Sequence, residues 1–253
     1  MVQIEVIALV LCRVLAFISL GPLFSQRDFP NSAKLILGVS LAMIAFPTAQ
    51  ATYVSTTTPI IFALLVIKEV LFGFTMGYLS QLVFNAVMIA GQIVDFQVGF
   101  TIAQAYDTTM QVQTSQYGKV YYWLAISMFF MLNLHQQLIR GVLVSFQIIP
   151  LGTAHFTGST IDGITKMIVK TIEMGLDLAA PLVVALIAID IILGVISRSI
   201  PQINVLMMSL PFKTGVSFII FFILLSNVLS FLANYLPTSI TQLMEFIRSV
   251  GNT

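Results

Sequence analysis

The feature that most constrains this chain is a series of long apolar segments with very few charges inside them. These segments cover roughly residues 4–24, 34–49, 60–94, 120–139, 167–197 and 214–236. A helix of about 20 apolar residues crosses a hydrocarbon layer of about 30 Å. Only 8% of the side chains are charged, whereas soluble domains have about a quarter. The sequence therefore predicts an all-α membrane protein.

Proline positions divide the chain into helices. Most of the nine prolines lie near the ends of the apolar segments or in the links between them, as expected of a residue that cannot continue a helix. Pro181 lies inside the fifth segment and predicts a kink there. Segment 34–49 is short, whereas 60–94 would be about 50 Å long at 1.5 Å per residue. We expect kinked helical hairpins, and segment 60–94 must tilt, bend or extend beyond the bilayer.

Several classes of function have no support in the sequence. The net charge of +1 argues against a broad nucleic-acid surface. Phosphate-binding, zinc-protease and serine-hydrolase motifs are missing from the sequence, and His135 and His155 have no acid or cysteine beside them. A single cysteine, Cys12, excludes an internal disulfide. We expect no catalytic residues, no metal and no cofactor.

The long segment 60–94 and the residue that follows it carry polar and small side chains at spacings of three, four or seven residues, which places them on one broad helix face. These residues are Glu69, Gly73, Gly77, Gln81, Asn85, Gln92 and Asp95. Gly73 and Gly77 also form a small-xxx-small motif, which lets two helices approach closely. The face is interpreted either as a helix-packing face or as a polar wall beside an aqueous path, and the two are compatible.

Charges within the apolar segments are costly unless they are paired or wet. Asp190 looks like the most buried acid of the sequence, and Glu69 lies in a similar apolar context. Each is interpreted as half of an interhelical ion pair or, alternatively, as a site for protons or ions.

Residues 97–122 have a different composition, rich in Gln, Thr and Ser and poor in charge. A flexible connector is one interpretation, because long loops are often functional or disordered. The alternative is a loop folded into a pore, where neutral side chains block passage without binding what passes.

Short cytoplasmic loops of membrane proteins are enriched in lysine and arginine. Arg198 and Lys213 bracket the segment 197–213, and Arg27 and Lys34 mark the first connection, whereas residues 50–59 carry no charge. These cations predict a cytoplasmic turn at 197–213. They also predict that residues 95–119 lie inside and that both chain termini lie outside.

Three stretches of the chain together carry a family resemblance. They are "CRVLAFISLGPLFSQRDFPNSAKLILGVSLAMIAFP" (12–47), "AGQIVDFQVGFTIAQAYD" (90–107) and "ISRSIPQINVLMMSLPFKTGVSF" (196–218). With them the chain resembles the FliR family, the flagellar branch of the export-gate proteins shared with virulence injectisomes. Residues 1–165 resemble a FliP subunit, and residues 166–253 resemble the two-helix FliQ subunit, with its turn at 197–213.

The resemblance implies a core subunit of the flagellar type III export gate in the bacterial inner membrane, at the flagellar basal body. Implied partners are FliP-type and FliQ-type subunits, FlhB, FlhA, unfolded export substrates and membrane lipid. It also implies a pore plug in the loop at about 97–119, formed by Phe100, Gln104, Asp107, Thr108, Met110, Gln111 and Gln113. The cytoplasmic hairpin turn would comprise Arg198, Pro201, Gln202, Asn204, Pro211 and Lys213.

One residue departs from the family pattern. Many relatives have proline directly after the loop aspartate, whereas Asp107 is followed by Thr108, which leaves the rigidity of this loop open. An injectisome gate homologue, a secondary transporter component and a membrane scaffold remain the alternatives.

Overall fold

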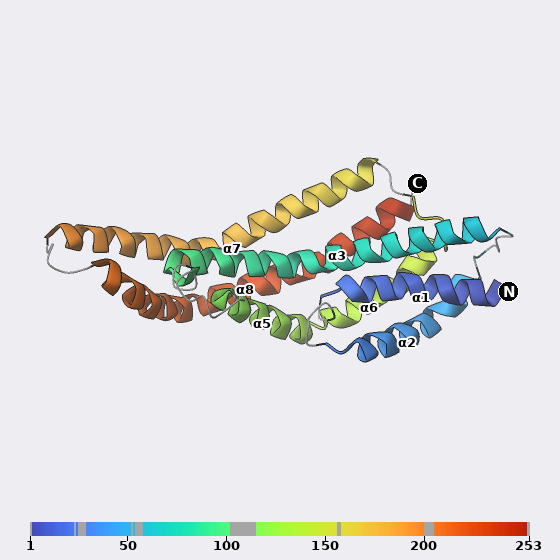
Figure 1. Ribbon diagram of the computed structural model, residues 1–253, viewed down its shortest axis with the longest axis horizontal. Coiled ribbons are helices and arrows are strands. Elements are labelled where there is room, and N and C mark those ends of the chain that lie inside the picture. The colour runs from blue at the N-terminus through green and yellow to red at the C-terminus, as the bar shows by residue number, and fades with distance from the viewer. Residues whose placement is uncertain are drawn as a thin grey trace. The chain divides into compact units, whose positions relative to one another are not determined.

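The computed structural model describes residues 2–22, 24, 29–51, 53, 58–101, 115–155, 158–199 and 205–251, and within them it is helical without strands (Figure 1). The helices are α1 (Val2–Leu20), α2 (Asn31–Gln50), α3 (Pro59–Val98), α5 (Gln116–Met131), α6 (Leu134–Ile148), α7 (Gly158–Ser199) and α8 (Val205–Gly251). All except α5 and α6 are long and apolar enough to cross a membrane. The predicted all-α membrane fold is confirmed.

The helices form two compact units, and the longest helices contribute to both. Unit 1 comprises residues 1–82, 129–169 and 236–253. Within it α2 packs against α1 and α6, and the Phe72 ring of α3 stacks on Phe246 of α8 at 5.6 Å between centroids. Its core is mostly apolar, with Arg13 and Glu69 among the few buried polar or charged residues.

Unit 2 comprises residues 83–128 and 170–235. Its interior includes the rings of Tyr117 and Tyr121 from α5 and of Phe221 from α8, and the exposed Phe218 stacks on Tyr117. Such ring pairs contribute about 0.5–1.5 kcal/mol beyond the area that they bury. The predicted division at residue 165 separates a FliP-like part from a FliQ-like part. It concerns likeness to other subunits and not compactness, so it stays a prediction.

The prediction of a single helical segment at 120–139 is wrong, because two helices, α5 and α6, occupy it. Asn133 adopts a left-handed conformation with φ of 55°, which separates α5 from α6. Asparagine tolerates this conformation better than most residues with a side chain. The segment predicted to be short, 34–49, extends as α2 over 20 residues.

The hairpin turn predicted at 197–213 is shorter than expected. Helix α7 continues to Ser199 and α8 begins at Val205, so Pro211 lies inside a helix and not in the turn. Pro237, expected near a helix end, is also inside α8. Helices accept proline at such points where neighbouring groups satisfy the freed carbonyl.

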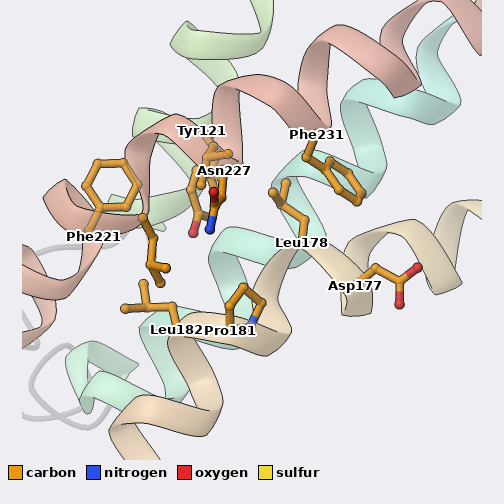
Figure 2. A pocket seen from close by; sticks show the side chains of 10 residues that line it. Tyr121, Asp177, Leu178, Pro181, Leu182, Phe221, Asn227 and Phe231 are labelled. Carbon is orange, nitrogen blue, oxygen red and sulfur yellow. The ribbon is translucent and has the colours of Figure 1, made fainter.

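Pro181 lies inside α7, as predicted, and a cavity of about 110 Å³ adjoins it in unit 2 (Figure 2). Leu178 and Leu182 of α7 and Phe221 and Phe231 of α8 make most of its wall apolar. The kink itself stays a prediction.

Candidate functional site

The packing face of α3 starts with a close contact to α1 in unit 1. A Cβ atom built at Gly77 would lie 2.6 Å from the carbonyl oxygen of Phe17, and one at Gly73 would lie 2.8 Å from the Cβ of Ala16. Real Cβ atoms do not come this close to their neighbours. Only glycine therefore allows the two helices to approach at these positions.

Other members of the predicted face have different surroundings. Glu69 and Asp95 are buried, Gln81 and Asn85 are half-buried, and Gln92 is exposed. The face is therefore a packing surface along part of its length and turns outward at Gln92.

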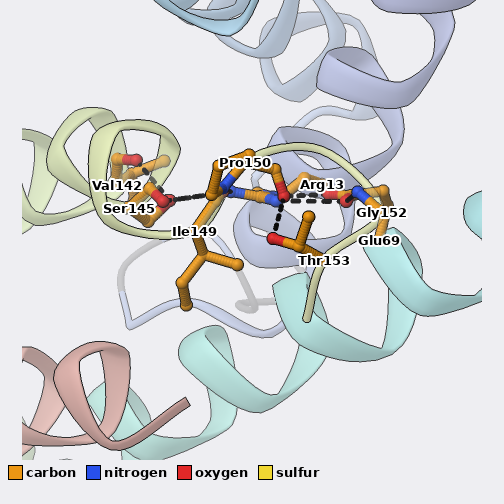
Figure 3. Close-up of polar contacts among 8 residues, drawn as sticks. All are labelled: Arg13, Glu69, Val142, Ser145, Ile149, Pro150, Gly152 and Thr153. Carbon is orange, nitrogen blue, oxygen red and sulfur yellow. Dashed lines mark hydrogen bonds and ion pairs between the residues drawn. The ribbon is translucent and has the colours of Figure 1, made fainter. Parts of the chain in front are cut away.

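Glu69 belongs to a buried polar network in unit 1 (Figure 3). Arg13 of α1 donates to both carboxylate oxygens of Glu69 through Nε and Nη2. Its Nη1 donates to the carbonyl oxygens of Ser145 at 3.3 Å and Ile149 at 3.2 Å. The backbone N–H of Gly152 donates to Oε1 of Glu69 at 2.8 Å. The network thus joins α1, α3, the end of α6 and the turn that follows it.

Both charges of this network are fully buried, with 0% of either side chain exposed. The Arg13 guanidinium also lies over the rings of Phe72 and Phe146, at 4.9 and 4.4 Å from their centroids. Buried charges persist when they are paired and hydrogen-bonded. The geometry of Glu69 therefore favours an interhelical ion pair over a proton or ion site.

Asp190 differs from the prediction of a buried charge, because its side chain is 41% exposed in this chain. Its Oδ1 pairs with Nζ of Lys213 of α8 at 2.6 Å, and its Oδ2 accepts a hydrogen bond from Nε2 of Gln97 at 2.8 Å. These three residues join α7, α8 and the last turn of α3 in unit 2.

The start of α5 in unit 2 is held from two directions. Ser115 precedes the helix, and its hydroxyl accepts the N–H of Gly118 at 2.8 Å, as a helix N-cap does. Asp95 of α3 accepts the N–H of Tyr117 through Oδ1 at 3.0 Å. A Cβ atom at Gly91 would overlap the backbone of Gly118, so α3 and α5 touch one turn before Asp95.

Tyr117 connects this region to α8. Its hydroxyl donates to Oγ of Ser217 at 2.8 Å, and its ring stacks on Phe218 at 5.7 Å. The centroid of the Phe100 ring lies 6.4 Å from that of the Tyr117 ring. Phe100 is the described member of the predicted plug and follows α3, so the chain just after α3 meets the start of α5 at Tyr117.

The other predicted plug residues lie outside the described residues. They are Gln104, Asp107, Thr108, Met110, Gln111 and Gln113. Three members of the predicted hairpin turn, Pro201, Gln202 and Asn204, also lie outside them. Arg198 is exposed in the last turn of α7, and Lys213 is half-buried in α8. The described residues contain no group of three or more potential metal ligands.

Sequence reasoning missed the partners of these charges. The acceptors for Arg13 include the carbonyl groups of Ser145 and Ile149, which no side-chain pattern reveals. Gly91 and Gly118 are far apart in the sequence, although Gly91 follows Gly77 by 14 residues, twice a spacing of seven that keeps residues on one helix face. That spacing was the available signal for a second contact along α3.

Comparisons with known proteins place the chain in a family. The model of the bacterial export proteins, family 1, matches residues 4–238. The flagellar biosynthetic protein FliR of Bacillus subtilis (strain 168) is 31% identical over 247 residues, which cover 96% of this chain and 95% of that protein. Those of Aquifex aeolicus (strain VF5) and Escherichia coli (strain K12) are 25% and 30% identical, over 94% and 79% of this chain and 92% and 77% of those proteins. The family resemblance is confirmed: the chain belongs to the bacterial export proteins, family 1.

Proposed function

We propose that this chain is a core subunit of the flagellar type III export gate in the bacterial inner membrane. With FliP-type and FliQ-type subunits it would form the channel that passes unfolded flagellar subunits. Relatives named flagellar biosynthetic protein FliR, which match it over nearly their whole length, support this proposal. Their names favour a flagellar gate over an injectisome gate.

The observation that carries the proposal is the length of the helices together with their apolar surface. Helices α3, α7 and α8 have 40, 42 and 47 residues. At 1.5 Å per residue they are about 60–70 Å long, roughly twice the hydrocarbon thickness. Large apolar side chains are exposed along them, among them Ile67, Leu176 and Phe222. Where such helices leave the lipid, sister subunits are the cover that an apolar surface needs.

The rival interpretation, a secondary transporter, would use intramembrane charges as coupling sites. Glu69 and Asp190 each have a cationic partner within the chain, Arg13 and Lys213 respectively. Partners of this kind favour structural roles for both acids. The export gate therefore explains the polar residues with fewer assumptions.

Within the gate, the loop at about 97–119 would act as the plug of the closed channel. Residues 200–204 connect α7 and α8, and this turn would face the cytoplasm and contact FlhB, with FlhA around the assembly. A plug made of neutral polar and apolar side chains stops ions by filling the pore, without binding the exported chain tightly.

Two measurements test this proposal. Tagged chain expressed with its FliP-type and FliQ-type neighbours should co-purify with them from detergent, and cells lacking it should fail to secrete filament protein. Deletion of residues 106–113 should leave co-purification intact and raise the ion conductance of energised membranes. Secretion without the chain would refute the gate role, and unchanged conductance after the deletion would refute the plug role.

A further inference from the structure

We propose that Asp95 holds the closed base of the plug loop by joining the end of α3 to the start of α5. We call the Asp95–Tyr117 contact the α3–α5 clamp. The inference rests on the proposed plug function for its effect on conductance, whereas the clamp itself can be tested without it.

The geometry of the clamp connects two separate helices. Asp95 is three residues before the end of α3, and its side chain is only 4% exposed. Its Oδ1 accepts the N–H of Tyr117, the second residue of α5, at 3.0 Å. The first N–H groups of a helix have no partner within the helix, and the helix dipole favours an anion beside them. A carboxylate from another helix therefore meets both requirements at this position.

The glycine contact lets the carboxylate reach its partner. Gly91 lies one turn before Asp95 on α3, and a Cβ atom at this position would overlap the backbone of Gly118. The helices thus touch at one point and are hydrogen-bonded next to it. In the sequence, the predicted plug residues lie between Asp95 and Tyr117.

Asp95 makes a single hydrogen bond in the clamp. Its second oxygen, Oδ2, is buried and has no hydrogen-bond partner among the described residues. An unpaired buried carboxylate oxygen is destabilising. An asparagine keeps one oxygen acceptor and removes the charge, so Asp95→Asn should preserve the clamp, whereas Asp95→Ala should open it.

Ser115→Ala supplies a matched control. It also removes one acceptor at the start of α5, since the Ser115 hydroxyl accepts the N–H of Gly118. That bond does not involve α3. The two variants therefore separate loss of a helix cap from loss of the connection between the helices.

Hydrogen–deuterium exchange of the purified gate complex measures the clamp directly. In Asp95→Ala the amide of Tyr117 and the amides of residues 92–98 should exchange about tenfold faster, because the acceptor of the Tyr117 N–H is lost. Ser115→Ala should accelerate exchange only in the first turn of α5, and Asp95→Asn should resemble the wild type. If Asp95→Ala does not co-purify with its partners, Asp95→Ser is measured in its place with the same expectations.

Ion conductance of energised membranes then tests the closing role. Asp95→Ala should conduct more than wild type, and Asp95→Asn and Ser115→Ala should not. Unchanged exchange at residues 92–98, or an open clamp in Asp95→Asn, overturns the inference. In another outcome, Asp95→Ala exchanges faster and yet does not leak, while the deletion of residues 106–113 does leak. That result overturns the closing role of Asp95 and leaves the proposed function standing. If that deletion does not leak either, the plug function fails, and the closing role of Asp95 fails with it.

Discussion

Removal of either charge from the Arg13–Glu69 pair should destabilise unit 1. Glu69→Leu leaves the Arg13 guanidinium buried with only neutral acceptors, and it also leaves the N–H of Gly152 without its partner. Both side chains are 0% exposed, so water cannot replace the lost contacts. Breaking a buried pair by removal of one partner costs about 3–5 kcal/mol. We expect a loss of this size in the free energy of unfolding.

Replacement of both charges should recover most of the loss. In Arg13→Met/Glu69→Leu no buried charge remains, and such apolar replacements are often neutral or stabilising. A double-mutant cycle should therefore give a coupling energy of about 2 kcal/mol or more, with the double variant more stable than either single one. Unfolding of the purified complex in mixed micelles measures all four proteins.

Glu245→Gln is the control for this cycle, because Glu245 is an exposed acid on α8 of the same unit. Its effect should stay within about 0.5 kcal/mol, as for most surface changes. Additive effects of the two charge removals, or single losses as small as the control, would refute the interpretation of the network as a buried structural pair.

Two further predictions concern unit 2. Gly91→Ala places a Cβ in the backbone of Gly118 and should lower the free energy of unfolding by about 1–3 kcal/mol or more. The control is Gly194→Ala, where a Cβ meets nothing within 4 Å. It should be neutral or stabilising in the same unfolding assay. Lys213→Glu sets two acids against each other and should impair secretion of filament protein, and the exchanged pair Asp190→Lys/Lys213→Glu should restore part of it. Wild-type swimming of the Lys213→Glu strain would contradict the second prediction.

The helical membrane fold could be predicted from the sequence, because the length of an apolar segment determines whether it can cross a bilayer as a helix. It was insufficient for the break at Asn133 and for the true extent of α7 and α8. An apolar segment does not reveal where one helix becomes two, since the break depends on a single left-handed residue. Likewise Pro211 and Pro237 looked like helix ends, although α8 continues through both.

Polar contacts were harder to predict than helices. Charge placement correctly marked Glu69 and Asp190 as residues that need partners. It could not identify those partners, because Arg13 and Lys213 are 56 and 23 residues away in the sequence. The contact of Asp95 with a backbone N–H had no side-chain signal at all. Tertiary packing decides such contacts.

The surface of α7 changes from charged to apolar along the helix. Its first half carries the charges Asp162, Lys166, Lys170, Glu173 and Asp177, spaced by three or four residues along one side and all exposed. Among the described residues none of them is in an ion pair with another residue, and each charge would cost a few kcal/mol at the centre of a bilayer. This half therefore needs water or a protein partner. After Asp177 the helix runs through Val184 and Val195 to Ser199, and these roughly 20 residues are long enough for one crossing. The one acid among them, Asp190, is paired with Lys213. Helix α7 thus joins a charged half to an apolar half that is long enough for one membrane crossing.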